Sequence, residues 1–419
     1  MNVVKTLIKS LRQYKKESVL SPVLVSLEVA LECMIPLYMV TMLEKIQEDN
    51  SIENILLYGG ILLVMAAFSL LFGMLAGRYA ATASAGFSRN LRADVYARIQ
   101  GFSFANIDKF SSSSLVTRLT TDITNIQNAY MMIVRVAVRC PVMLVISLIM
   151  AFTINVKISL IFFALIPVLG IGLFIIFRKV EPIFNRVFKK YDAMNNSVQE
   201  NIKGMRVVKS YVREEYEKEK FGATAQDVRA DFTRGETIIA LNAPLMQLSI
   251  WTAITLICIF GSSIIIRTTG SELNEAALSS LIAYAAQILS SLMMLSMVMV
   301  MISIATSSAE RVAEVLNEES TLKNPEDPVY EVADGSVEFR NVGFKYSEKA
   351  ERFALHNINL RVESGQTVGI LGGTGSSKTS LVNLIPRLYD VTEGQVMVGG
   401  RDVRDYDIES LRNQVSVVL

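Results

Sequence analysis

One short segment of the chain has residue types and spacing suited to binding a phosphate. Residues 372–379 have the sequence Gly-Gly-Thr-Gly-Ser-Ser-Lys-Thr. Glycines let a backbone wrap a phosphate and point its N–H groups inward. Lys378 would reach the β- and γ-phosphates of a nucleotide, and Thr379 would place its hydroxyl on Mg²⁺. We therefore predict an ATP-binding loop, with ATP and Mg²⁺ as cofactors, formed by Gly372, Gly373, Thr374, Gly375, Ser376, Ser377, Lys378, Thr379 and Ser380.

The loop departs from the usual phosphate-binding pattern at Ser377, since the position before the lysine is normally glycine. A Cβ atom there lies where the backbone should closely approach a phosphate. The N–H group is unchanged, so we expect binding to be weakened but retained. The alternative is a site that holds nucleotide poorly.

A phosphate-binding loop needs a strand before it and a helix after it. The apolar run Thr367–Leu371 predicts the strand, and the run from Ser380 to Ile385 predicts the helix. The helix N-terminus would add positive potential. Alternating apolar residues around Val337–Val342 and at 359–362 predict further strands. Residues 329–419 are therefore expected to form part of an α/β nucleotide-binding domain, joined by a Pro-containing linker at 323–328.

The preceding 300 or so residues have a composition that favours a membrane protein. The chain is 51% hydrophobic and 19% charged, whereas soluble domains are about a quarter charged. Its net charge of +1 gives no indication of nucleic-acid binding, and we expect no nucleic-acid partner. A bilayer-spanning helix needs about 20 mostly apolar residues. Such stretches lie at 18–43, 55–79, 133–153, 158–177, 238–266 and 276–305.

The connections after the second and fourth stretches are long and also have helical patterns, so they predict two helical arms extending from the membrane. Lys and Arg are concentrated in the arms and in residues 1–17, while the first short loop is acidic. By the positive-inside rule, the N-terminus, the arms and the nucleotide-binding domain are expected to be cytoplasmic. Residues 1–17 are basic and amphipathic, which predicts a helix lying at the membrane interface.

Two acidic residues occur within the first predicted span. Glu28 and Glu32 are four residues apart and so share one helix face. Charges at membrane depth are costly and indicate function by default. One hypothesis places the two carboxylates in a cavity that attracts cationic substrates. The other pairs them with polar groups of neighbouring helices or with water. Arg135 and Arg139, near the start of the third span, are expected to be paired or to extend toward the interface.

The order of six spans, two long arms, a linker and a phosphate-binding loop resembles the exporter branch of the ATP-binding-cassette (ABC) transporters, in the style of the multidrug half-transporters. The segment Val337–Tyr346 resembles the family's strand ending in an adenine-stacking aromatic residue, which would be Tyr346. The segment Glu200–Ser210 resembles the second coupling helix, which implies a coupling role for Gly204, Met205, Arg206 and Val207. Phe110–Asp122 resembles the region of the first coupling helix. In this family, such helices dock on the ATP-binding domains.

The resemblance implies a six-helix transmembrane domain at 18–322 followed by a partial α/β cassette that stops before the family's glutamine loop. It implies ATP-driven export of drug-like compounds, lipids or peptides across the plasma (inner) membrane by a dimer of two halves, and Ser377 leans toward a heterodimer. The family's signature sequence and hydrolytic residues do not occur here, so ATPase activity is left open and no catalytic residue is assigned. The alternative is a regulatory or incompetent half that binds nucleotide and a partner without hydrolysis.

Overall fold

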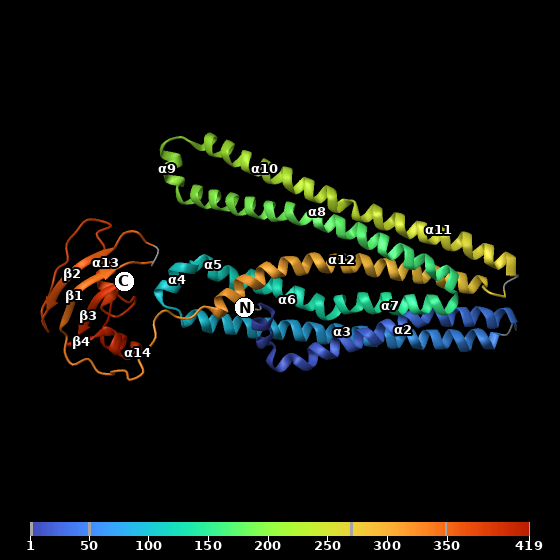
Figure 1. Cartoon of the computed structure of the whole chain (residues 1–419), viewed down its shortest axis with the longest axis horizontal. Helices are drawn as coiled ribbons and strands as arrows, with labels where there is room; N and C mark the ends of the chain where they lie inside the picture. Colours follow the sequence, from blue (N-terminus) through green and yellow to red (C-terminus); the bar gives the residue numbers. More distant parts are fainter. Residues whose placement is uncertain (1–2, 49–51, 269–270, 348–349, 419) are drawn as a thin grey trace. The chain divides into compact units, whose positions relative to one another are not determined.

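The computed structural model describes residues 3–48, 52–268, 271–347 and 350–418 (Figure 1). These residues fold as two compact units. The larger unit comprises residues 13–84 and 128–303. The smaller unit takes in the N-terminal residues up to Arg12, residues 85–127 and the chain from Ile304 onward. Several long helices run from one unit into the other, so each unit is described by its own contacts.

Long apolar helices dominate the first three quarters of the chain. The longest are α2 (Lys15–Glu48), α3 (Ile52–Gln100), α7 (Val138–Ile154), α8 (Val156–Lys203), α11 (Asn242–Thr268) and α12 (Glu275–Asn317). Six helical stretches of the described chain are long and apolar enough to cross a membrane. The predicted six-helix transmembrane domain followed by a sheet-containing domain is therefore confirmed. The predicted fifth span, 238–266, begins in the preceding helix α10 (Glu214–Ala240), because the helix breaks at Leu241.

The core of the larger unit lies where α8, α11 and α12 meet. Its central side chains, Tyr284, Ile288, Ile257 and Phe162, are almost completely buried. The Tyr284 hydroxyl donates a 2.7 Å hydrogen bond to the carbonyl oxygen of Cys33 in α2. This bond gives a buried phenol the partner that it needs.

The second arm consists of the distal part of α8 and helix α10, which pack along each other (Figure 1). A short helix, α9 (Met205–Ser210), connects them at the tip. Lys190 of α8 forms a 2.7 Å ion pair with the buried Asp231 of α10.

The first arm is built from the end of α3, the short helices α4 (Phe104–Phe110) and α5 (Ser112–Thr117), the π-helical turn η2 (Arg118–Asp122) and helix α6 (Ile123–Met132). A second π-helical turn, η3 (Ile133–Ala137), leads into α7. Ser103 caps α4 in a reciprocal capping box with Asn106. The predicted region of the first coupling helix, Phe110–Asp122, begins at the last residue of α4 and contains α5 and η2. Its coupling role stays a prediction.

We predicted one helix over residues 1–17, but the structure shows a break in this segment. Residues 1 and 2 lie outside the described residues. Helix α1 (Val3–Ile8) is followed by a 3₁₀ segment, η1 (Lys9–Tyr14), with non-helical backbone angles at Arg12. Both Ser10 and Arg12 bond to Asp94 of α3, at 2.6 and 2.5 Å. These contacts accompany the break and hold the segment against α3.

The C-terminal part of the smaller unit contains an antiparallel sheet with strand order β2-β1-β3-β4 (Figure 1). The strands are β1 (Val337–Phe344), β2 (Leu355–Val362), β3 (Glu393–Val398) and β4 (Arg401–Asp402). This part of the unit also contains helix α13 (Lys378–Leu384), the turn η4 (Val403–Asp405) and helix α14 (Ile408–Gln414). The buried side chains of Phe339, Val342, Leu384 and Leu411 contribute to one core.

One predicted strand is wrong. Residues 367–371 have no strand geometry, and Leu371 is 98% exposed. A strand in a parallel sheet is buried on both faces and bonds to neighbours on both sides. Within the described residues, the four-stranded sheet leaves this segment without such a neighbour. The apolar sequence alone does not impose the extended pairing.

Candidate nucleotide-binding site

The predicted phosphate-binding loop forms a turn that leads directly into α13. Residues 372–377 are irregular, and helix α13 begins at Lys378. Gly375 has a left-handed φ of 84°, which glycine adopts without strain. A Cβ atom added at Gly372 would lie 2.6 Å from the Ser376 hydroxyl, whereas Gly373 and Gly375 border open space. The loop is therefore compact on one side and open on the other, as a phosphate cradle requires.

Ser377 adopts the backbone conformation that normally selects glycine. Its φ and ψ are 60° and 24°, in the left-handed region. For a residue with a Cβ atom, this conformation costs about 1–2 kcal/mol. Ser377 is therefore expected to weaken nucleotide binding for two reasons. Its side chain would occupy space near a phosphate, and its Cβ atom strains the backbone of the loop.

Lys378 is folded back onto the loop. Its ammonium group donates 2.8 Å hydrogen bonds to the carbonyl oxygens of Gly372 and Gly373 and a 3.2 Å bond to the Ser376 hydroxyl. An ammonium group held inside a glycine-rich loop fits a ligand with several anionic oxygens. The hydroxyl of Thr379 is carried on the first turn of α13, and this residue is exposed.

Tyr346 lies beside the helix that follows the loop, although the two are more than 30 residues apart in the sequence. Its hydroxyl shares a 2.6 Å hydrogen bond with that of the buried Ser380. Phe344 and Tyr389 pack edge-on against its ring, with centroid distances of 4.8 and 5.4 Å. Tyr346 nevertheless remains 48% exposed. A fixed ring with an accessible surface is suited to stacking on a purine.

Tyr389 connects this aromatic group to helix α4 of the first arm. Its hydroxyl donates a 2.7 Å hydrogen bond to Oδ2 of Asp108, and its ring lies 5.9 Å from that of Phe104. Burial, followed by the bond to the Asp108 carboxylate and its negative charge, raises the pKa of Tyr389 well above the usual tyrosine value. The phenol therefore stays protonated and continues to donate at neutral pH.

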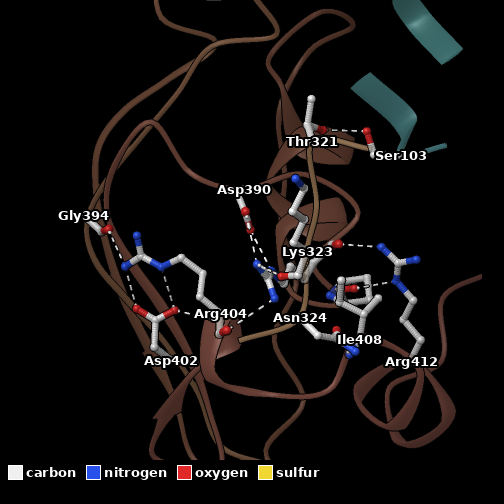
Figure 2. Close-up of polar contacts among 12 residues, drawn as sticks. Ser103, Thr321, Lys323, Asn324, Asp390, Gly394, Asp402, Arg404, Ile408 and Arg412 are labelled. Carbon is white, nitrogen blue, oxygen red and sulfur yellow. Dashed lines mark hydrogen bonds and ion pairs between the residues drawn. The ribbon is translucent and has the colours of Figure 1, made fainter. Parts of the chain in front are cut away.

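The segment that follows α12 forms polar contacts with the first arm and with the sheet-containing part of the smaller unit (Figure 2). The Thr321 and Ser103 hydroxyls share a 2.7 Å bond at the base of α4. The buried Arg387 donates to Oδ1 of Asp390 at 2.8 Å and to the carbonyl oxygen of Lys323 at 3.2 Å. Asn324 Oδ1 accepts a 3.0 Å bond from the N–H group of Ile408. The linker thus has defined hydrogen-bond partners at several points.

A further ion pair rigidifies the turn that follows β4. Arg404 bonds to Asp402 Oδ2 at 2.6 Å and reaches the carbonyl oxygen of Gly394 at 3.4 Å (Figure 2). Burial alone would raise the pKa of Asp402, but the hydrogen bonds and charge of Arg404 outweigh burial and lower it. The carboxylate therefore remains ionised as part of the domain's framework.

The predicted coupling residues lie at the tip of the second arm. Gly204 caps the end of α8, and Met205, Arg206 and Val207 form the first turn of α9. None of the residues of α9 is buried, and Val207 is 60% exposed.

Glu28 and Glu32 are paired with an arginine of a neighbouring helix, as one of the two hypotheses states. Arg139 of α7 donates to Oε1 of Glu28 at 2.5 Å and to Oε2 of Glu32 at 2.6 Å. The expectation that Arg139 is paired is thereby met, whereas Arg135 is exposed.

Sequence reasoning missed the residues that link the site to the first arm. Tyr389, Asp108 and Phe104 were not among the predicted site residues, and Tyr389 and Asp108 are 281 positions apart. No local spacing connects them. Phe104 and Asp108 also lie just before the segment Phe110–Asp122, which resembles the region of the family's first coupling helix.

Comparison with known proteins agrees with this arrangement. The model of the ABC transporter transmembrane region matches residues 19–293, and the ABC transporter model matches residues 355–419. An uncharacterized ABC transporter ATP-binding protein of Bacillus subtilis is 30% identical over 97% of this chain and 70% of its own length. A second, of Mycobacterium tuberculosis, is 30% identical over 91% of this chain and 66% of its own length.

An ATP-dependent lipid A-core flippase of Aromatoleum aromaticum is 27% identical over 85% of this chain and 58% of its own length. The chain thus spans between about half and three quarters of the length of these relatives. Six apolar helices, a glycine-rich loop before a helix, and matches to both family models lead to one conclusion. The chain belongs to the ABC transporters, in their exporter branch.

Proposed function

We propose that this chain supplies one half of a dimeric exporter that uses ATP to move amphipathic small molecules across the plasma (inner) membrane. The observation that carries the proposal is the position of Tyr389. One side of its ring contacts the exposed aromatic Tyr346, and its hydroxyl bonds to Asp108 of helix α4. A nucleotide stacked on Tyr346 would therefore lie one side chain away from an arm of the transmembrane part.

The loop residues have distinct roles in this proposal. Lys378 would exchange its bonds to the loop carbonyls for bonds to phosphate oxygens. Thr379 would contribute a hydroxyl to Mg²⁺, which usually keeps water and phosphate ligands in addition to few protein groups. Bound MgATP would supply the free energy that drives the change in conformation. Tyr346 would hold the purine, and its bond to Ser380 would keep the ring in register with the loop.

The second arm supports the proposed partner, a second half-transporter. Its tip carries exposed apolar side chains, including Met205, Val207, Tyr211 and Val212. Exposed apolar groups gathered at one place mark an interaction surface. We propose that this tip docks on a cassette and that the arms, the N-terminus and the cassette are cytoplasmic. We also propose that the substrates include lipids, since one relative is named a lipid A-core flippase.

A second candidate is a half that binds nucleotide without hydrolysing it. The strained left-handed backbone of Ser377 favours this candidate, because it opposes the loop conformation that binds a phosphate. In a heterodimer, this site would bind ATP without hydrolysing it, and the second ATP site would carry out hydrolysis.

Transport in proteoliposomes distinguishes these candidates. The protein would be reconstituted with and without a candidate partner half, and MgATP-driven uptake of a fluorescent amphipathic dye would be measured together with phosphate release. We expect uptake that requires ATP and is abolished by Lys378→Ala. ATP binding without phosphate release in either preparation would support the non-hydrolysing half. Uptake that is the same without ATP would overturn the proposed ATP-driven export.

A further inference from the structure

The paired carboxylates at membrane depth leave one oxygen atom unsatisfied. Arg139 bonds to one oxygen of Glu28 and one of Glu32. Glu28 is only 8% exposed, yet its Oε2 atom has no hydrogen-bond partner among the described residues. A buried polar atom without a partner is costly, particularly one that carries charge. It therefore calls for an explanation beyond the pairing with Arg139.

Helix α3 makes room for this carboxylate and for an arginine. A Cβ atom added at Gly73 would lie 3.0 Å from Oε1 of Glu28, and one added at Gly77 would lie 3.3 Å from a guanidinium nitrogen of Arg135. Residues four apart on a helix have Cβ positions about 5–6 Å apart. Gly73 and Gly77 thus place a carboxylate and a guanidinium next to each other along one face, about one helical turn apart.

A cavity of about 490 Å³ opens at this position. Glu28 and Glu32 of α2, Gly73 of α3 and Arg135 of η3 line it. Its size is within the range of small-molecule sites. The cavity also has an apolar side, formed in part by Leu70 and Met74 of α3, which are 64% and 59% exposed.

Two polar groups at the cavity lack a protein partner among the described residues, Oε2 of Glu28 and the guanidinium of Arg135. Arg139 is held by two carboxylates, but Arg135 forms no hydrogen bond or ion pair within the part of the chain that the structure describes. A simple cation would satisfy Glu28 and be repelled by Arg135. A simple anion would satisfy Arg135 and be repelled by Glu28. A ligand with both charges, separated by a few bonds, would satisfy the two groups at once.

We propose that this cavity binds the zwitterionic ammonium–phosphate head group of an amphiphile. The ammonium group would lie beside the Glu28 and Glu32 carboxylates that line the cavity and the phosphate on Arg135, while an alkyl chain would follow Leu70 and Met74 on α3. This proposal deepens the proposed export function by naming a class of molecule that the transmembrane part takes. It concerns binding alone, so it is testable without nucleotide.

The test measures amphiphile binding to the full chain in a non-ionic detergent by native mass spectrometry, without ATP. The probes are lysophosphatidylethanolamine (zwitterionic), lysophosphatidic acid (anionic), hexadecyltrimethylammonium (cationic) and free phosphoethanolamine. We expect preference for the zwitterionic amphiphile, with about tenfold weaker binding in Glu28→Gln and in Arg135→Gln. Arg78→Gln is the matched control, since Arg78 follows Gly77 on α3 but does not line the cavity.

A steric variant tests the site without changing its charge. Gly73→Ala would crowd the Glu28 carboxylate and should weaken binding, whereas Gly60→Ala on the same helix has no heavy atom within 4 Å and should not. If free phosphoethanolamine binds as tightly as lysophosphatidylethanolamine, the roles of the carboxylates and Arg135 stand and the ligand is a soluble zwitterion. Binding that is unaffected by both charge variants would overturn the proposal, as would equal binding of all three charged amphiphiles. Neither result would affect the test of ATP-driven transport.

Discussion

At the scale of single residues, the phosphate-binding loop shows both what a sequence reveals and what it conceals. Glycine and lysine spacing predicted a phosphate-binding loop at 372–380, and the resemblance to the ABC exporters implied a purine-stacking role for Tyr346. The left-handed backbone of Ser377 was not readable, because a φ value depends on the turn that the whole loop makes. The ion pairs of Arg139 were one of several open alternatives, since sequence gives helix faces but not which faces meet.

Replacing Ser377 tests whether its backbone conformation limits nucleotide binding. In Ser377→Gly, the left-handed conformation is free of strain, so the binding-ready loop should be more populated. We expect ATP to bind about fivefold more tightly, corresponding to about 1 kcal/mol. Titration with a fluorescent ATP analogue measures this affinity.

The reciprocal variant provides the control. Gly375→Ser introduces a Cβ atom at a φ of 84° and should weaken binding in the same assay. Unchanged affinity in Ser377→Gly would show that neither the strain nor the side chain of Ser377 is a handicap.

At the scale of elements, apolar periodicity was sufficient for the long helices but not for the strand before the loop. A run of 20 apolar residues forms a helix whatever its neighbours are, because a helix satisfies its own backbone. Residues 367–371 are apolar too, but a strand needs partners that their sequence does not specify. The cap at Ser103 similarly fixed the position of α4 through local hydrogen bonds that the pattern of apolar residues does not show.

The contact between α4 and the cassette should depend on the Tyr389 hydroxyl. Tyr389→Phe keeps the ring but removes the bond to Asp108, which we expect to weaken the contact by about 1.5 kcal/mol. Protease sensitivity of residues 101–111 reports the loosening. Tyr330→Phe, at a tyrosine that is 61% exposed, should have no effect.

The same contact has a predictable pH dependence. Because the pKa of Tyr389 is raised in the folded protein, the contact contributes its full stability below the ordinary tyrosine pKa of about 10 and loses it only at higher pH. Wild-type protease sensitivity should therefore be flat between about pH 6 and 9. A steep change within that range would be inconsistent with a tyrosine donor.

An ion pair between the buried Asp122 and the half-exposed Arg311 ties the first arm to the end of α12. Asp122, 1% exposed, accepts a 2.9 Å bond from the Ser308 hydroxyl and a 2.8 Å bond from Nε of Arg311. Because water can solvate Arg311 once the carboxylate charge is gone, we expect a cost of about 1–3 kcal/mol, below that of a fully buried pair. Asp122→Asn should therefore lower the melting temperature clearly. Glu215→Gln removes the exposed pair with Lys218 and should change it little; equal melting temperatures for the two variants would refute the distinction.

At the scale of the whole molecule, the transmembrane part and the partial cassette were both predictable, because each has a sequence signal of its own: apolar length in one and the phosphate-binding loop in the other. Their connection was not, because it depends on pairs such as Asp108 and Tyr389 that are 281 residues apart. The family models matched the same two parts of the chain, at 19–293 and 355–419.

The tip of the second arm provides a test of the proposed dimer. Val207→Asp places a charge on the exposed apolar surface of α9 and should reduce ATP-driven dye uptake several-fold while leaving ATP affinity unchanged. Ala223→Asp, at an exposed position of α10 away from the tip, is the matched control. Equal uptake by the two variants would argue against docking by this surface.

The central claim is that nucleotide bound at the loop is sensed by helix α4 through Tyr346 and Tyr389. Hydrogen–deuterium exchange of the protein in lipid nanodiscs, with and without MgATP, tests this claim most directly. We predict that MgATP slows exchange both in residues 372–380 and in residues 104–110, and that Lys378→Ala abolishes both effects. Slower exchange in the loop with no change in α4 would contradict the claim.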